Sequence, residues 1–341
     1  MIPTLKTEIN KTLPTIPTSL ITPKAFDALS RVAERIPSCA VQNYMFECRL
    51  GNKKNETVDI QFTVALDSCV HRWLLGKQSP NQKDAHIKLP DTAGWRQLAA
   101  FARHWKNLES SNPSHIWIGL DIDPQHPSIP EPLIHIRTNH LTFEETLGLT
   151  EHLMGKRLRE RARLSLRKCF HESSKPPHYI GIMLGRQVNT LRMVNALPLY
   201  SVEKYLERID WPRSLESIRP MLTLLEGSCS NVGLSLDISD RIESYLGMEI
   251  MNWDKPKATH RQWLEILSRL SAAGLCSQQE IEALATYPGI TPSENKPNEN
   301  NTKIIIQRRY LSHLKLVAMT KKGFSLKAYL GSKQDTLSRK T

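Results

Sequence analysis

Hydrophobic and polar residues alternate at period two in ten short stretches of the chain, and these stretches come in pairs. In one of them Val58, Ile60 and Phe62 alternate with Asp59 and Gln61. Such alternation is typical of strands that have one buried face, and short polar connections between paired stretches indicate hairpins. The pairs cover residues 44–51 with 57–66, 115–123 with 132–138, 179–186 with 190–197, 232–239 with 245–252, and 312–319 with 324–330. The pattern therefore predicts about ten antiparallel strands in five hairpins.

Helical periodicity fills the gaps between the hairpins. Thr142 with Glu145 and Ser277 with Glu280 have the spacing of capping boxes, in which each side chain satisfies a free backbone donor at a helix start. A hairpin sheet must cover its apolar face, and helices are the available cover. Closure of about ten strands would remove the vulnerable sheet edges. We expect an α+β fold of repeated αββα units, a barrel or strongly curved sheet with helices on its outer face.

Three segments lack a hydrophobic pattern and are predicted to be disordered. They are the Thr- and Pro-rich residues 1–21, the polar loop 291–303 and the tail 331–341. Residues 22–330 then form a single domain.

The strands have one clearly apolar row and one polar row. If the apolar row packs against the helices, the polar row lines the inside of the barrel. A lining of mixed charge with aromatic residues is typical of a binding chamber, because unpaired charges in a packed core would be very costly. The inward row comprises Glu47, Arg49, Asp59, Gln61, Trp117, Asp121, His135, Arg137, Gly181, Met183, Ser235, Asp237, Tyr245, Glu249, His313, Lys315, Lys327 and Tyr329.

This topology, together with the Lys327-x-Tyr329 pair and the inward Lys315, resembles the αββα-barrel (ABBA) aromatic prenyltransferases over residues 24–330. The resemblance implies a transferase that moves an allylic group from an isoprenoid diphosphate to a peptide or aromatic acceptor, with no required cofactor. It implies a diphosphate site at Arg49, Arg137, Lys315 and Lys327, and a catalytic, acceptor-binding Glu47. It also implies cation-shielding or substrate-lining roles for Trp117, His135, Tyr245, His313 and Tyr329. Fixed cations stabilise a departing diphosphate, and aromatic faces stabilise an allylic cation.

Two alternatives remain open for this row. Asp59, Asp121, Asp237 and Glu249 bring more negative charge than a diphosphate chamber should need, unless a divalent ion such as Mg²⁺ bridges some of them. The wet face of an open antiparallel sheet would show the same alternation. Asp121 and Asp123 share a strand face, but no third ligand accompanies them, so no resident metal site is predicted.

The net charge of the chain indicates a possible binding partner on the outer surface. The 341 residues contain 46 Lys and Arg against 34 Asp and Glu, a formal net charge of +12, which favours polyanionic partners. The densest basic run, residues 156–170, includes Arg159, Arg163 and Arg167, which either form a solvated helix face or dock an acidic leader peptide or nucleic acid.

The residues 287–290, 312–319 and 325–331 also look like uncharacterised bacterial proteins linked to modified-peptide (RiPP) biosynthesis. A non-catalytic, peptide-binding accessory protein of such a pathway is therefore the alternative to a transferase. A nucleic-acid-binding protein is the third interpretation, although no base-stacking or groove-reading motif accompanies the basic run.

Location follows from what the chain lacks. No window approaches the roughly 18 to 20 apolar residues of a membrane-spanning helix, and the N-terminus has no signal-peptide pattern. The six cysteines are scattered without a metal-like spacing, so we expect them to be reduced. Together these features predict a cytoplasmic protein.

Overall fold

Five antiparallel hairpins form the centre of the computed structural model, as the period-two pattern predicts. The structure describes residues 4–37, 43–51, 57–77, 87–105, 113–126, 128–184, 190–250, 260–292, 303–318 and 323–338. The strands are β1 Asn43–Leu50, β2 Val58–Ala65, β3 His115–Leu120, β4 Leu133–Arg137, β5 Tyr179–Met183, β6 Leu191–Pro198, β7 Asn231–Ile238, β8 Ile242–Ile250, β9 Gly289–Pro292, β10 Lys303–Ala318 and β11 Phe324–Ser338.

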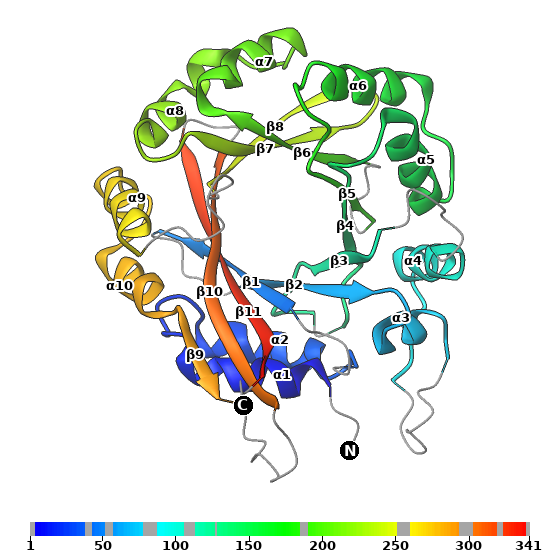
Figure 1. The fold of residues 1–341 in the computed structure, drawn as a ribbon, viewed down its shortest axis with the longest axis vertical. Helices are drawn as coiled ribbons and strands as arrows, with labels where there is room; N and C mark the ends of the chain where they lie inside the picture. Colours follow the sequence, from blue (N-terminus) through cyan, green and yellow to red (C-terminus); the bar gives the residue numbers. More distant parts are fainter. Residues whose placement is uncertain are drawn as a thin grey trace.

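The sheet closes on itself. Its strand order is β11-β1-β2-β3-β4-β5-β6-β7-β8-β10-β9, and β11 also pairs with β10. All these pairings are antiparallel, and the ten strands without β9 make a closed barrel, viewed end-on in Figure 1. Closure confirms the α+β barrel and excludes the open sheet with a wet face.

Helices surround the barrel (Figure 1). They are α1 Leu5–Thr12, α2 Pro23–Ala33, α3 Cys69–Leu74, α4 Ala93–His104, α5 Phe143–Met154, α6 Glu160–His171, α7 Val202–Arg208, α8 Arg219–Leu225, α9 His260–Ala272 and α10 Gln278–Thr286, with 3-10 turns at Leu13–Thr15, Leu199–Ser201 and Leu215–Ser217. Both predicted capping boxes are present, Thr142 with Glu145 at α5 and Ser277 with Glu280 at α10. No described helix has the length and apolar character needed to cross a membrane.

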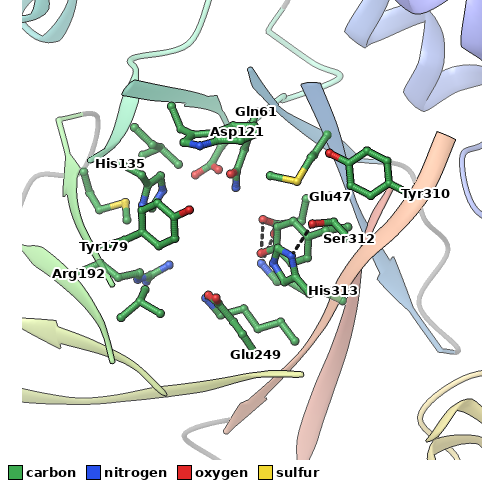
Figure 2. Close-up of a pocket in the computed structure, with 18 residues that line it drawn as sticks. Glu47, Gln61, Asp121, His135, Tyr179, Arg192, Glu249, Tyr310, Ser312 and His313 are labelled. Atoms are coloured by element: carbon green, nitrogen blue, oxygen red, sulfur yellow. Dashed lines mark hydrogen bonds and ion pairs between the residues drawn. The ribbon is translucent and has the colours of Figure 1, made fainter. Parts of the chain in front are cut away.

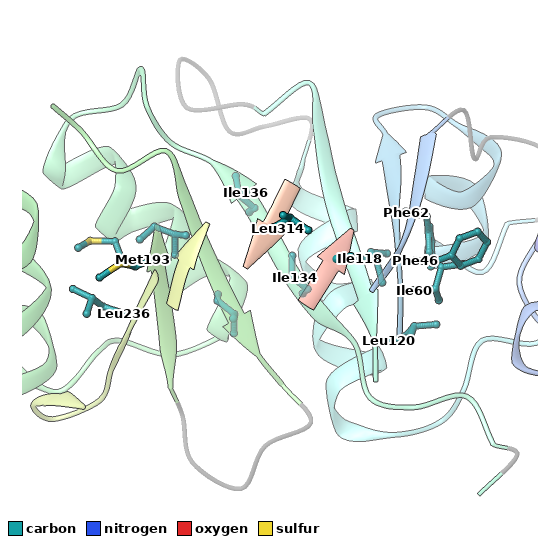
Figure 3. Packing of buried hydrophobic residues seen from close by; sticks show 14 of the residues in the cluster. Phe46, Ile60, Phe62, Ile118, Leu120, Ile134, Ile136, Met193, Leu236 and Leu314 are labelled. Atoms are coloured by element: carbon teal, nitrogen blue, oxygen red, sulfur yellow. The ribbon is translucent and has the colours of Figure 1, made fainter. Parts of the chain in front are cut away.

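The outward row of the strands makes the hydrophobic core with the helices. Ile60, Phe62, Ile118 and Leu314 are fully buried there (Figure 3). Burying each such side chain contributes about 1.5–3 kcal/mol, so this outer layer carries most of the hydrophobic stabilisation of the barrel.

The N-terminal segment differs from the prediction, because residues 1–21 were expected to be disordered. Instead α1 buries Leu5 and Ile9 completely. Thr12 at its end is within 2.5 Å of the Tyr44 hydroxyl and 3.1 Å of the Ser332 hydroxyl. The few apolar residues of this segment lie on one face of the helix. Its high Thr and Pro content suggested disorder, although the spacing of the apolar residues fits a helix.

The C-terminal end differs too. The tail 331–341 was expected to be disordered, but β11 continues to Ser338, paired with a β10 that begins at Lys303 rather than near 312. The short β9 adds to this extension and was missed. Backbone pairing gives these polar residues an ordered partner that their composition does not reveal. The predicted loop 291–303 falls mostly outside the described residues, with β9 and β10 at its two ends.

Four cysteines, Cys48, Cys169, Cys229 and Cys276, are free. Cys69 is disulfide-bonded, contrary to the expectation that the cysteines are reduced. Spacing along the chain gave no sign of this bond, because disulfide partners are brought together by the fold.

Candidate active site

The barrel encloses a cavity of about 170 Å³ that opens to solvent. Figure 2 shows polar and aromatic side chains converging on it from strands around the barrel. The lining residues are Met45, Glu47, Gln61, Trp117, Asp121, Leu133, His135, Tyr179, Met183, Arg192, Val194, Glu249, Tyr310, Ser312, His313, Lys315, Lys327 and Tyr329. This polar lining confirms that the barrel holds a chamber rather than a packed core.

Glu47 of β1 is held by two neighbours from β11. Lys327 Nζ donates a hydrogen bond to one carboxylate oxygen, and the Tyr329 hydroxyl donates to the other at 2.6 Å. Burial disfavours the charged carboxylate, but the charge of Lys327 and these two hydrogen bonds outweigh burial and lower the pKa of Glu47 to about 2. Glu47 is therefore a fixed anion at neutral pH.

Lys315 of β10 forms a second buried ion pair. Its ammonium donates to Glu249 at 2.9 Å and to the Ser235 hydroxyl at 2.9 Å, and Ser235 also donates to Glu249 at 2.9 Å. The antiparallel register places Lys315 directly opposite Glu249 of β8. Burial is outweighed by the charge of Lys315, which lowers the pKa of Glu249 to about 2.

Arg192 of β6 forms the third pair. Its guanidinium donates to both carboxylate oxygens of Asp237, at 2.7 and 2.9 Å. The Tyr245 ring lies 4.2 Å from the guanidinium carbon, a cation–π contact, and Lys315 lies 6.0 Å from the same ring. Two hydrogen bonds and one ring contact thus hold the guanidinium in place.

An aromatic stack separates these ion pairs. The imidazole of His313 lies 3.9 Å from the Tyr329 ring at an interplanar angle of 15°. Its Nδ1 is 3.1 Å from the Ser312 hydroxyl. Burial lowers the pKa of His313 to about 4, so this ring is neutral at neutral pH.

Acidic groups collect on the side of the barrel formed by β1, β2 and β3. Asp59 pairs directly opposite Glu47 in the sheet register and accepts the Ile122 backbone N–H at 2.9 Å. Burial and the nearby charges of Glu47 and Asp121 raise the pKa of Asp59 to about 8. Asp59 is therefore a neutral carboxylic acid at neutral pH, which removes one of the charges counted against an anionic ligand.

His135 of β4 points into the chamber across from Glu47 (Figure 2). It pairs in register with Trp117 on one side and Gly181 on the other. A side chain at Gly181 would place its Cβ 2.6 Å from His135 Nδ1, so the imidazole occupies the space that this glycine leaves. Burial and the charge of Arg192 lower the pKa of His135 to about 4.

Seven of the residues predicted for the site line the chamber together: Glu47, Trp117, His135, His313, Lys315, Lys327 and Tyr329. Three others do not line it. Tyr245 lies behind Arg192. Arg49 is half-exposed and 4.0 Å from Asp59, and Arg137 ends β4 and donates to Asn139 at 3.0 Å. Both arginines have the inward parity but lie near strand ends, beyond the chamber.

Sequence reasoning missed Arg192, Tyr179 and Tyr310. Arg192 had a usable signal, because Leu191 and Met193 alternate with it in a predicted strand. Tyr310 had none, because it lies in the part of β10 that precedes the predicted strand.

Two of the predicted docking arginines, Arg163 and Arg167, lie on α6, and Arg159 immediately precedes it. The apolar side of α6 buries Leu166 and Phe170. Arg159 pairs with Asp240 at 3.1 Å, Arg163 with Glu160 at 3.9 Å and Arg167 with Glu144 at 3.4 Å. These exposed pairs are worth little energetically, but they partly neutralise the surface that an acidic peptide would contact.

Among the described residues, no group of three or more His, Cys, Asp or Glu side chains has the arrangement of a metal site. In particular, Asp121 and Asp123 acquire no third ligand from the described residues of neighbouring strands.

Solved structures with the same fold exist, although no protein-family model and no curated sequence matches the chain. The 5-dimethylallyltryptophan synthase of Streptomyces coelicolor is 10% identical, covers 97% of this chain and 98% of its own, and has a TM-score of 0.52. The apo form of prenyltransferase PriB is 11% identical over 96% of this chain and 95% of its own, with a TM-score of 0.51. A 6-dimethylallyl tryptophan synthase is 10% identical over 96% and 95%, with a TM-score of 0.52. The chain therefore has the αββα-barrel fold of these prenyltransferases along nearly its whole length.

Proposed function

We propose that this protein is a prenyltransferase-like transferase, which moves an allylic group from an isoprenoid diphosphate to an aromatic or peptide acceptor inside the barrel. The observation that carries the proposal is the chamber itself, which sets Arg192, Lys315 and Lys327 beside the aromatic rings of Tyr329 and His313. The shared fold supports it, since one solved complex of the Streptomyces coelicolor enzyme contains DMASPP and Trp.

Arg192, Lys315 and Lys327 are the cations that would bind the donor. Their charge would stabilise the diphosphate as the allylic C–O bond breaks, and the tyrosine faces would stabilise the allylic cation. Arg49 and Arg137, which the resemblance implied for this role, are less favourably placed because they do not line the chamber.

The acceptor would bind against Glu47. This carboxylate is ionised and fixed by Lys327 and Tyr329, and its oxygens have further lone pairs for an N–H or O–H of the acceptor. A hydrogen bond to a fixed anion makes an indole or phenol ring more electron-rich and orients it toward the allylic carbon. Trp117, with Met45 and Leu133, supplies apolar surface for the acceptor ring or the isoprenoid chain.

The carboxylate partners of the three cations raise the question of a metal. Glu47, Glu249 and Asp237 would repel a diphosphate unless its charge were reduced by protons or by Mg²⁺ carried with it. We expect transfer without added metal, because Asp59 is already neutral and the cations are fixed. Activity in EDTA, compared with activity in added MgCl₂, tests this: complete loss in EDTA that MgCl₂ restores would contradict metal independence.

The direct test is an incubation of the full chain with dimethylallyl, geranyl and farnesyl diphosphate and with tryptophan, tyrosine and peptides that contain them. Mass spectrometry should detect an acceptor gaining one prenyl unit, with stoichiometric diphosphate release. Lys315→Met should abolish both signals. Absence of any prenylated product with the wild-type protein would refute the proposal.

A non-catalytic, peptide-binding accessory protein is the second candidate. One observation favours it: Arg192, Lys315 and Lys327 each already have a carboxylate partner from the protein itself. Calorimetric binding of an acidic leader-type peptide without turnover, weakened by charge reversal at Arg159, Arg163 and Arg167, would identify this role. Salt-sensitive binding of nucleic acid in the same assay would indicate the third alternative.

We expect the protein to act in the cytoplasm. The four free cysteines support this location, and the disulfide at Cys69 opposes it, because disulfides persist in oxidising compartments. Subcellular fractionation with thiol labelling of the native protein would decide between the two.

A further inference from the structure

Prenyl transfer to an aromatic carbon needs a base that removes a proton. The inference drawn from this requirement rests on the proposed function. When the allylic C–O bond breaks, its electron pair leaves with the diphosphate. A π-electron pair of the acceptor ring then forms the new C–C bond, which leaves a cationic ring. The hydrogen on the attacked carbon must depart as a proton so that its C–H electron pair restores aromaticity. The chamber therefore needs a group that is unprotonated, accessible to the ring and able to take up that proton.

Most candidate bases of the chamber are already occupied. Glu47 accepts hydrogen bonds on both oxygens from Lys327 and Tyr329, and Glu249 accepts from Lys315 and Ser235. These two carboxylates are suited to holding charge and orientation rather than to removing a proton.

Asp59 and His313 are unsuitable for different reasons. Asp59 carries a proton at neutral pH and does not line the cavity. His313 is only 8% exposed, with its ring stacked on Tyr329 and its Nδ1 next to the Ser312 hydroxyl. The stack on Tyr329 covers one face of the ring and Ser312 engages Nδ1, so His313 offers less free ring edge to an acceptor than His135 does.

We propose that His135 is the general base that removes the ring proton from the acceptor. Its imidazole faces the cavity from β4 and has no hydrogen-bond or ion-pair partner among the described residues. The imidazole packs into the space that Gly181 leaves beside it, and this packing uses no hydrogen bond to either ring nitrogen. Glu47 lies across the chamber, so an acceptor held by that carboxylate presents its far edge toward His135 (Figure 2).

The electrostatics of the chamber keep this imidazole in its basic form. Burial and the charges of Arg192 and Lys315 disfavour the imidazolium, while Glu249 and Glu47 favour it less strongly. A weakly basic imidazole is sufficient, because the cationic ring intermediate is a far stronger acid than an imidazolium. The proton moves from the ring carbon to the unprotonated nitrogen of His135, and the imidazolium then releases it to solvent or to the departing diphosphate.

His135→Gln is the main test, with ring-deuterated L-tryptophan and ring-deuterated L-tyrosine as acceptors and dimethylallyl diphosphate as donor. Glutamine keeps polar contacts but cannot take up the proton. We expect product formation to fall about 100- to 10,000-fold, the usual contribution of a positioned general base. Donor breakdown to diphosphate should continue. A primary deuterium isotope effect, absent in the wild-type protein, should appear because proton removal becomes rate-limiting.

Two further variants separate proton transfer from packing. Gly181→Ala would push the imidazole out of its place without removing it, and should lower product formation and raise the isotope effect in the same direction. His115→Gln is the matched control, since His115 lies on β3 and does not line the chamber. It should leave rate and isotope effect unchanged.

Three outcomes would overturn the proposal. If His135→Gln forms product at the wild-type rate without an isotope effect, His135 is not the base, and the proposal is overturned. If His135→Gln fails to fold, unchanged kinetics in Gly181→Ala would overturn the proposal equally. If the wild-type protein prenylates no acceptor with any of the donors above, the proposed function fails; if it prenylates an acceptor and the His135 and Gly181 variants behave as the wild type, only the role of His135 fails.

Discussion

The two faces of the barrel sheet solve the problem of burial in different ways. On the outward face, Phe62, Ile118 and Leu314 are buried against helices by contacts that need no polar partner. On the inward face of the same strands, Lys315 and Glu47 are buried almost as deeply, but each has a charged partner from a neighbouring strand. The outward face therefore supplies stability. The inward face is less stabilising, because burying its charges costs desolvation free energy. In return, those charges have fixed positions before any ligand enters the chamber.

Breaking one inward ion pair should have the largest effect. Lys315→Met leaves Glu249 as an unpaired buried carboxylate, so we expect the free energy of unfolding to drop by about 3–5 kcal/mol. The double variant Lys315→Met/Glu249→Leu should recover most of this loss, because an apolar pair replaces the ion pair. Urea denaturation measures both. A loss below about 1 kcal/mol in the single variant would show that water reaches Glu249 freely.

Truncating an outward side chain should have the next largest effect. Ile118→Ala on β3 leaves a cavity between the sheet and the helices, and should cost about 3 kcal/mol. The matched control is Trp117→Phe, one position away and facing the chamber. We expect it to cost less than about 1 kcal/mol because Trp117 is only partly buried. Equal losses in the two variants would contradict the division of roles between the faces.

The inward face should also respond to pH in a characteristic way. Asp59 holds its proton in the folded state up to about pH 8, whereas the unfolded chain releases it in the usual carboxyl range. Asp59 therefore contributes stability that is lost as pH rises from about 4 to about 8, while His135 and His313, whose pKa values are lowered to about 4, contribute stability that is lost as pH falls below about 6.5. The fall due to Asp59 should be visible between about pH 7 and 8, and Asp59→Asn should remove it. Glu47 and Glu249 act in the opposite direction, with stability lost only as pH falls below about 4 toward 2. Thermal unfolding measures this dependence, and no fall between about pH 7 and 8 would show that Asp59 is ionised in the folded protein.

Charge reversal on α6 should have the smallest effect. Arg159→Glu, Arg163→Glu and Arg167→Glu remove exposed ion pairs, so each should change the free energy of unfolding by less than about 1 kcal/mol. Transfer to a small aromatic acceptor should be unaffected, because α6 lies outside the barrel. A large loss of transfer to free tryptophan would show that the outer surface and the chamber are coupled.

The sequence predicted the regular parts of the fold well, because one physical rule governs them. Alternation such as that of Val58, Asp59 and Ile60 identifies the strands, and the capping box at Thr142 locates a helix start. The rule failed where order depends on a distant partner. Leu5 and Ile9 find their burial against the rest of the fold, and the end of β11 is ordered by pairing with β10.

The candidate site was predicted only in part for a related reason. Parity along a strand places Glu47, His135 and Lys315 on the inward side, but it cannot tell the middle of the barrel from its ends. Arg49 and Arg137 have the correct parity and still lie outside the chamber. The residues that face each other across neighbouring strands also depend on the register of the strands. The sequence therefore could not predict that Lys315 pairs with Glu249.

By itself, then, the sequence determined the strands, their hairpins and the polar character of one face, because period-two alternation is a local property of the chain. Tertiary structure alone decided the closure of the sheet through β10 and β11, the neutralisation of each chamber cation by a carboxylate, and the free imidazole of His135 above Gly181. These features depend on residues up to about 280 positions apart, such as Glu47 and Lys327. Only the register of the closed barrel brings such residues together, and their pKa values follow from that proximity.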